Sequence, residues 1–265
     1  MFFTNEVRYV SNRKYSRGEM ISPSTFYDIT PFNYGYSSKE DIIANMHPFL
    51  KELMKNNLGK IFCDIGCGCG RNLLYATKFA KKIIGVDLSK RSLDLAKEVV
   101  KCDKVELILG NNLDLPLDSE IADLVISDGV CHHTGDTRKA FSECIRIVKP
   151  QGYLFLAVYK KFRYYPLLYF SIGSFFRFIN KVKIGNYIIE NIFINIHYIF
   201  YRLFKKLFLL RKETRNIFYD YFMNPIVTFQ SKHDVNGWCI NNNCNIIKYS
   251  RTSGNCHIFV IQKNV

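Results

Sequence analysis

From Gly59 onward, short apolar segments alternate with stretches of helical periodicity, and this alternation is the strongest constraint on the fold. In the helical stretches, apolar residues such as Leu93 and Ala96 recur three or four positions apart and share one helix face. Strand, helix, strand, helix indicates a parallel sheet covered on both faces, the doubly wound α/β class. Pro150–Gly152 is expected to end the helix 137–148 before the fifth strand. The strand-like runs are 60–64, 82–86, 105–109, 123–127 and 153–158.

A basic and aromatic segment interrupts the alternation after Val158. Residues 160–215 contain twelve lysines and arginines but only two acids, so most of the chain's net charge of +14 lies there. After Pro225 the pattern resumes, with a predicted helix followed by two strands. We therefore expect an insertion late in the sheet and not a separate domain. The predicted division is 1–58 (N-terminal segment over the site), 59–159 (cofactor-binding core), 160–220 (helical insertion) and 221–265 (last helix, 232–240, and strands, 245–249 and 256–262).

Composition limits the class of protein. With 48% hydrophobic and 23% charged residues, the 265-residue chain can bury a full core, which excludes general disorder. The net charge of +14 favours anionic partners, such as nucleic acid, acidic lipid or a phosphorylated substrate. Three of the nine cysteines (Cys63, Cys67 and Cys69) crowd into one short segment that disulfides would distort, so we expect reduced thiols.

The apolar runs are too short to span a bilayer, which takes roughly 18 or more apolar residues. The run 164–176 ends at Arg177, and the run 191–201 contains Asn195 and His197. The start of the chain also lacks the basic residues and apolar run of a signal peptide. We expect a cytoplasmic protein whose contact with a membrane, if any, is peripheral.

A glycine-rich turn follows the first predicted strand. Its sequence is Asp64-Ile65-Gly66-Cys67-Gly68-Cys69-Gly70. Glycines let the backbone turn sharply from strand into helix and approach a ligand closely. About twenty residues later the second strand ends at Asp87, where a carboxylate can accept hydrogen bonds from two ribose hydroxyls. A glycine turn followed by such an acid indicates a nucleoside cofactor.

The spacing of these glycines argues against a dinucleotide. The dinucleotide pattern needs a glycine three residues after its second glycine, but Arg71 stands three residues after Gly68, which disfavours an NAD-dependent oxidoreductase. Asp64 would repel a pyrophosphate, whereas it suits a ligand that carries an ammonium group. The segment from Asp64 to Gly70 resembles the first motif of the class I S-adenosylmethionine-dependent methyltransferases.

Three later segments extend this resemblance. Residues 110–117 resemble the family's adenine-binding loop, and residues 123–133 resemble its fourth-strand motif. Residues 145–154 resemble its lysine-proline-glycine-glycine run, with Gln151 in place of one glycine. The likeness covers about 59–158 and is greatest for the methyltransferase type 11-like branch, which acts on small molecules, as the quinone-biosynthesis methyltransferases do. It implies a seven-stranded Rossmann-like sheet whose last strand is antiparallel.

The resemblance also implies S-adenosylmethionine as the cofactor. Asp87 would bind the ribose, and Asn111 would bind the adenine amino group through its amide oxygen. Asp64 would orient the amino-acid end of the cofactor; in the alternative, it caps the amides of its own turn. The implied cofactor-binding residues are Asp64, Gly66, Cys67, Gly68, Gly70, Asp87, Leu88, Asn111, Asn112, Leu113 and Ser127.

Methyl transfer from a sulfonium is an in-line displacement, in which the protein mainly aligns the reactants and excludes water. A general base is needed only for a poorly acidic acceptor. His132, His133 and Asp128, which follow the fourth strand, are the candidate catalytic residues. In the alternative, one histidine packs under the next helix and the other lies at a polar rim. No metal site is expected, because the one-residue spacing of Cys67 and Cys69 is poor for zinc.

Two segments leave alternatives open. Tyr27, Phe32 and Tyr34 form either an aromatic lid over the cofactor or ordinary packing against the sheet. The basic segment 160–215 suits an interfacial helix on anionic lipid, a cap over an apolar substrate, or ordinary helices with a solvated basic face. Its basic residues mix with aliphatic ones, so we do not expect a nucleic-acid partner.

The sequence therefore predicts an enzyme that transfers a methyl group from S-adenosylmethionine to an O, N or C atom of a small acceptor, apolar or lipid-linked in character. Two alternatives stay open. The first is an RNA or protein methyltransferase, although Ser127–Val130 lacks the Asn/Asp-Pro-Pro-aromatic signature of amide-binding sites. The second is a cofactor-binding scaffold without activity. The acceptor and the oligomeric state are left open.

Overall fold

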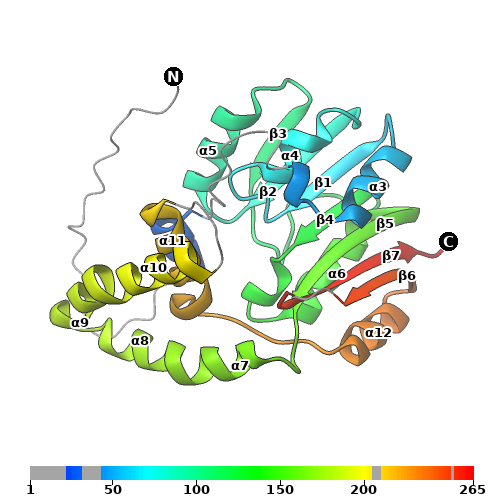
Figure 1. The fold of residues 1–265 in the computed structure, drawn as a ribbon. Coiled ribbons are helices and arrows are strands. Elements are labelled where there is room, and N and C mark those ends of the chain that lie inside the picture. Colours follow the sequence, from blue (N-terminus) through cyan, green and yellow to red (C-terminus); the bar gives the residue numbers. More distant parts are fainter. Residues whose placement is uncertain (1–21, 32–42, 205–209, 252–253) are drawn as a thin grey trace.

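A computed structural model describes residues 22–31, 43–204, 210–251 and 254–265. Its centre is a seven-stranded sheet with the strand order β3-β2-β1-β4-β5-β7-β6 (Figure 1). The predicted seven-stranded, Rossmann-like α/β fold is confirmed. The strands are β1 (Ile61–Ile65), β2 (Lys82–Asp87), β3 (Val105–Leu109), β4 (Ala122–Asp128), β5 (Val148–Tyr159), β6 (Cys244–Arg251) and β7 (Cys256–Lys263).

Strand direction gives the sheet one functional edge. β1 to β5 pair in parallel, and β7 pairs antiparallel with both β5 and β6, as expected for the last strand. The chain builds outward from β1 to β3 and then returns to place β4 on the other side of β1. The connections after β1 and β4 therefore leave in opposite directions. In sheets of this kind, ligands bind in the crevice at that reversal.

Helices cover both faces of the sheet because each has one apolar side. Leu93, Ala96 and Val100 form the buried side of α5, and Phe141 and Cys144 are buried on α6. One face is covered by α3, α4 and α5, and the other by α6 and α12. These helices are α3 (Pro48–Asn56), α4 (Arg71–Ala76), α5 (Lys90–Val100), α6 (Thr137–Ile147) and α12 (Lys232–Asn241).

The sequence predicted that Pro150–Gly152 separates the helix from the fifth strand, and this position is wrong. α6 ends at Ile147, and β5 already begins at Val148, so these residues lie inside the strand. Gln151 has a φ of 62°, and the pairing with β4 shifts register next to it. The segment is a bulge that lets a proline and a left-handed residue interrupt the ladder without ending the strand.

The insertion forms three helices, each with a π-helical turn, which lie at the lower left of Figure 1. A short N-terminal helix, α1 (Pro23–Ile29), packs against them: Phe26 belongs to a buried cluster with Phe176 and Phe218. The insertion therefore has an apolar core separate from the two faces of the sheet. Its helices are α7–α8 (Tyr164–Leu168, Tyr169–Gly173 in the π form, Ser174–Ile179), α9–α10 (Lys183–Ile188, Ile189–Phe193 in the π form, Ile194–Phe204) and α11 (Arg211–Phe218), which ends in a π turn (Tyr219–Met223).

We predict that Gly66→Ala destabilises the fold by roughly 2–4 kcal/mol, measured by urea denaturation. Gly66 has a φ of 74°, and a Cβ there would lie 2.3 Å from a methyl carbon of Val130. The left-handed backbone costs about 1–2 kcal/mol and the overpacking about 1–3 kcal/mol. Adding Val130→Ala, which removes the two closest carbons, should return most of the overpacking part and none of the backbone part. Gly59→Ala is the matched control, because its φ is 75° and nothing lies within 4 Å of the added Cβ; an equal loss there would contradict the steric argument.

Candidate functional site

The glycine turn lies at the reversal of strand order and is bonded to β2. The backbone amides of Gly66 and Cys67 donate to the carbonyl oxygen of Val86, at 2.7 Å and 3.0 Å. Gly66, Gly68 and Gly70 all have a positive φ, between 52° and 85°. The turn therefore approaches the tip of β2 with bare backbone, which leaves room for a ligand along it.

Asp87 caps this turn from the tip of β2. Its two carboxylate oxygens accept hydrogen bonds from the amides of Gly68, at 2.8 Å, and Ser89, at 2.9 Å. Burial raises the pKa of Asp87, and these two amides oppose that rise by stabilising the carboxylate. Each carboxylate oxygen keeps a second lone pair. Asp87 can therefore accept hydrogen bonds from two neighbouring hydroxyl groups.

Asp64 is buried beneath the same turn and is under-paired. One carboxylate oxygen accepts a long hydrogen bond from the Asn72 side-chain amide, at 3.4 Å. The other oxygen, and the amide oxygen of Asn72, have no partner within the described part of the chain. No turn amide donates to Asp64, so the capping alternative for this residue is wrong. Burial raises the pKa of Asp64 to about 7. Two buried, unpartnered acceptor oxygens, one of them a carboxylate oxygen of Asp64, suit an ammonium group.

An ion pair that the sequence analysis missed crosses the site. Arg71, the first residue of α4, donates to the carboxylate of Asp128 at the end of β4. Both side chains are about four-fifths buried. Asp128 was predicted as a catalytic residue, whereas Arg71 was not predicted as a residue of the site. The two are 57 positions apart, so nothing in the local sequence signals the contact.

The predicted adenine loop presents two asparagines in different ways. The side-chain oxygen of Asn111 accepts a hydrogen bond from the Leu113 amide, at 2.9 Å, in an exposed turn. Asn112 is buried, and its side-chain oxygen has no partner among the described residues. Leu88, just beyond Asp87, is partly exposed. The loop thus offers an unpaired amide oxygen, and the segment after β2 an apolar side chain, to a planar base.

Two predicted cofactor residues direct their side chains into the core. Ser127 is fully buried, and its hydroxyl lies 3.1 Å from the Cys131 sulfur. Cys67 is buried in the cluster beneath α4 and α5, with its sulfur 3.9 Å from the Gly68 carbonyl oxygen. At both positions the side chain is used for packing, so only the backbone can line the site.

The two histidines occupy a 3₁₀ turn, Cys131–His133, and differ in their partners. His132 is fully buried against the Tyr159 ring, with 3.8 Å between ring centroids, and neither ring nitrogen has a partner in the described residues. Burial holds the pKa of His132 well below its usual range, so its ring is neutral. This matches the packing alternative for one of the pair.

His133 belongs to a buried polar cluster that joins four parts of the chain. Its Nδ1 lies 3.1 Å from the Ile226 carbonyl oxygen and 3.1 Å from the side-chain amide of Asn224. Its Nε2 lies 3.9 Å from the carboxylate of Asp220, in the last π turn of the insertion. The Tyr159 hydroxyl donates to Asp220 at 3.3 Å. Burial lowers the pKa of His133, and the Asp220 carboxylate opposes that shift.

The N-terminal helix α1 reaches both halves of the site. Asp28 accepts a hydrogen bond from the Ser89 hydroxyl, at 2.7 Å, where α5 begins. Tyr27 accepts one from Asn224, at 2.8 Å, beside His133. α1 therefore connects the tip of β2 to the polar cluster. Phe32 and Tyr34, the other predicted lid residues, lie outside the described residues.

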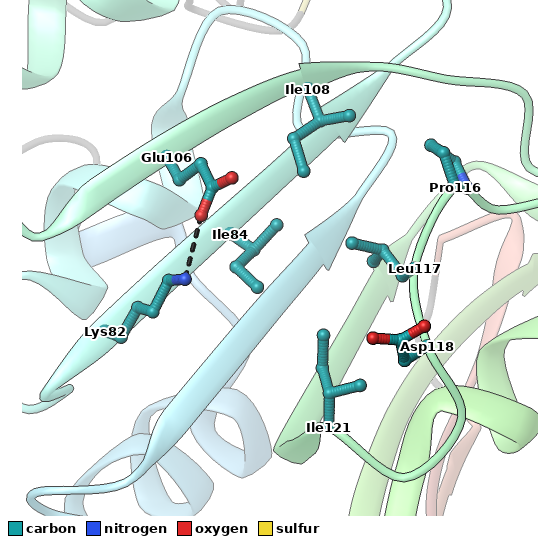
Figure 2. Close-up of a pocket in the computed structure, with 8 residues that line it drawn as sticks. All are labelled: Lys82, Ile84, Glu106, Ile108, Pro116, Leu117, Asp118 and Ile121. Carbon is teal, nitrogen blue, oxygen red and sulfur yellow. Dashed lines mark ion pairs between the residues drawn. The ribbon is translucent and has the colours of Figure 1, made fainter.

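A shallow hollow of about 360 Å³ lies elsewhere, on the open face of β2 and β3 (Figure 2). Lys82 and Glu106, which form an ion pair of 2.8 Å, line it where these strands begin. Pro116 and Leu117 of the predicted adenine loop also line this hollow, but neither the glycine turn nor Asp87 does, so we do not assign it to the candidate site. In the described residues, no group of three or more His, Cys, Asp or Glu side chains could hold a metal ion.

Comparisons with known proteins agree with this geometry. Residues 63–156 match the methyltransferase domain family. The demethylmenaquinone methyltransferase of Oceanobacillus iheyensis is 30% identical over 128 residues, which cover 44% of this chain and 54% of that protein. A probable fatty acid methyltransferase of Pseudomonas putida is 35% identical over 92 residues, which cover 33% of this chain and 23% of that protein. The chain thus spans about half or less of the length of these relatives.

A solved structure extends the likeness beyond the matched segment. The S-adenosylmethionine-dependent methyltransferase described from Listeria monocytogenes superposes with a TM-score of 0.55 at 16% identity and covers 82% of this chain and 97% of that one. At that identity the likeness shows the fold alone. Residues 63–156 therefore form a methyltransferase domain, in a chain whose sheet has the fold of S-adenosylmethionine-dependent methyltransferases.

Proposed function

We propose that this chain transfers a methyl group from S-adenosylmethionine to an O, N or C atom of a small apolar acceptor. One observation carries the proposal: two different acceptor groups lie on either side of the glycine turn. Asp87, at the tip of β2, suits the two hydroxyls of a ribose. The unpartnered oxygens of Asp64 and Asn72 suit an ammonium group. A nucleoside joined to an amino acid carries both.

The remaining cofactor contacts follow from the same geometry. Arg71, oriented by Asp128, would pair with the carboxylate of the amino-acid end, so we propose that Asp128 is a positioning residue. Asn112 and Leu88 would hold the base. When bound, S-adenosylmethionine supplies an electrophilic methyl carbon, and the protein has to align the acceptor with it and exclude water.

We propose that His133 is the residue that removes a proton when the acceptor needs it. Its Nε2 lies near Asp220, which stabilises the protonated ring and so assists proton uptake. His132 is a weaker candidate because its ring is enclosed and has no carboxylate nearby to stabilise its protonated form. α1 lies over both halves of the site, which supports the proposed role of the N-terminal segment as a lid.

An apolar acceptor is supported by the surroundings of His133. The rings of Tyr159, Tyr165 and Phe229 pack together at the end of β5. The names of the two curated relatives point to demethylmenaquinone and fatty acid as the substrates of those proteins. An RNA or protein methyltransferase is not better supported: the net charge of +14 suits nucleic acid and acidic lipid alike, and Ser127–Val130 lacks the amide-binding signature.

The first test is calorimetric titration with S-adenosylmethionine and S-adenosylhomocysteine. We expect binding with a Kd on the order of micromolar, weakened about tenfold or more by Asp87→Ala, since tenfold corresponds to about 1.4 kcal/mol of lost ribose contacts. Asp94→Ala, an exposed acid of α5 in an i,i+4 pair, is the matched control and should bind normally. Wild-type protein that is folded but binds neither compound would refute the proposal.

The raised pKa of Asp64 predicts a pH dependence. An ammonium ligand needs the carboxylate, so affinity should rise by up to about tenfold per pH unit below pH 7 and level off above it. The stability of the cofactor-free protein should depend on pH in the opposite direction. Burial raises the pKa of Asp64 from 3.8 to about 7, so the free energy of unfolding falls as the pH rises from 3.8 to about 7. Asp64→Asn should therefore raise the Tm at pH 8 while weakening cofactor binding. A lower Tm, or unchanged affinity, would contradict this assignment.

The role of His133 is tested by transfer of a labelled methyl group into a lipid extract. His133→Gln should reduce transfer by roughly 10²–10⁴-fold with cofactor affinity unchanged, as expected for loss of a general base. Asp220→Asn should move the acidic limb of the pH profile to lower pH, because Asp220 raises the pKa of His133. The exposed His233→Gln is the control. Full transfer by His133→Gln would exclude it as the base.

A further inference from the structure

Exposed apolar side chains gather on one part of the molecule, the helical insertion. Elsewhere the described residues expose few large apolar groups, and these are scattered along the chain. Such concentration marks a surface that is covered by a partner or a membrane. The exposed apolar side chains of the insertion are Phe162, Tyr164, Leu167, Phe170, Ile172, Phe175, Phe178, Val182, Ile184, Tyr187, Ile192, Ile196, Ile199, Phe200, Leu203 and Leu210.

The two long helices are apolar on both sides. In α7–α8, Tyr165 and Phe176 are buried toward the rest of the protein, whereas Leu167, Phe175 and Phe178 are more than half exposed. In α9–α10, Ile189 and Ile194 are buried and the exposed residues recur along the opposite side. A helix at a water-facing surface normally has polar residues on its outer side. These outer sides therefore favour an apolar environment.

Basic residues border this surface. The turn between the two helices, residues 180–182, is flanked by Phe178 and Ile184 and carries exposed Lys181, with exposed Lys183 beginning the next helix. We call residues 178–187 the basic–apolar tip. Figure 1 shows α8 and α9 at the lower left of the molecule, away from the sheet. Long lysine side chains can bury their stems and keep the charge in a polar headgroup layer.

Acidic residues do not oppose an anionic partner here. Between residues 160 and 215 the only acids are Glu190 and Glu213. Glu190 is paired with Arg215 at 2.7 Å and accepts from the Tyr219 hydroxyl. Glu213 accepts a hydrogen bond from the Leu210 amide. The two acids of this segment therefore do not neutralise its excess of positive charge.

We propose that the basic–apolar tip and the outer sides of α7–α8 and α9–α10 dock on an anionic lipid bilayer. The apolar side chains enter the boundary between headgroups and acyl chains, and Lys181 and Lys183 meet lipid phosphates. The exposed apolar residues run along the outer sides of these helices, so the helices dock parallel to the surface. None of the described helices is long and apolar enough to cross a membrane. A second copy of this chain is disfavoured as the occupant, because it would bring two surfaces of like charge together.

Docking would also bring the proposed acceptor side next to lipid. The same insertion contributes Asp220 on its inner side to the polar cluster around His133. This consequence rests on the proposed function, whereas lipid binding itself does not. An acceptor with a long apolar chain could then pass from the bilayer to the site without crossing water.

The test is flotation of the full chain, without cofactor, on phosphatidylcholine vesicles with and without about one-third phosphatidylglycerol. Wild-type protein should float with the anionic vesicles only. Phe178→Ser with Val182→Ser and Ile184→Ser, and separately Lys181→Gln with Lys183→Gln, should each reduce the bound fraction by about tenfold. Leu58→Ser with Leu109→Ser and Ile240→Ser, exposed apolar residues outside the insertion, form the matched control.

Three outcomes would overturn the inference. The first is wild-type protein that stays in solution with anionic vesicles, and the second is a control triple variant that loses as much binding as the tip variant. The third is a dimer in light scattering that the tip substitutions dissociate, which would assign the surface to a second copy. Asp87→Ala should float like the wild type, so failure of cofactor binding is distinguishable from failure of lipid binding.

Discussion

The site depends on the attachment of the glycine turn to the tip of β2. The turn amides of Gly66 and Cys67 donate to Val86, and the amide of Gly68 donates to Asp87. Because β1 lies where the strand order reverses, the connections on either side diverge and leave the turn accessible. The contacts that hold the backbone of the turn therefore also orient the Asp87 carboxylate beside the turn. One set of hydrogen bonds therefore both stabilises the folded turn and fixes the geometry of the proposed ribose site.

Around this fixed turn, several buried polar groups lack partners in the described residues. Asp64, Asn72, Asn112 and His132 each have at least one buried atom without a hydrogen bond. Such atoms cost stability, commonly about 1–3 kcal/mol each. Three of the four lie beside the glycine turn or in the predicted adenine loop, where a ligand could satisfy them. The raised pKa of Asp64 has the same cause: burial disfavours the charged carboxylate as long as no cation is bound beside it.

The insertion links the proposed chemistry to a surface. On its inner side, the π turn of Tyr219–Met223 supplies Asp220 to His133, and Asn224 follows directly. On its outer side, it exposes apolar residues between lysines. A single element thus helps to enclose the acceptor side and is the part of the described chain best suited to lipid. These roles are compatible because they use different helices of the insertion: the π turn after α11 contacts His133, whereas the exposed apolar residues lie on α7–α8 and α9–α10.

The sequence by itself determined the order of strands and helices, the glycine turn and the positions of Asp64 and Asp87, because these follow from local periodicity and short spacing. Only the tertiary structure decided which side chains meet. The Arg71–Asp128 pair and the His133–Asp220 contact join positions 57 and 87 apart, and no local pattern encodes them. The tertiary structure also distinguished His132 from His133: both are buried, but within the described residues only His133 has polar partners, because neighbours on a turn point into different surroundings.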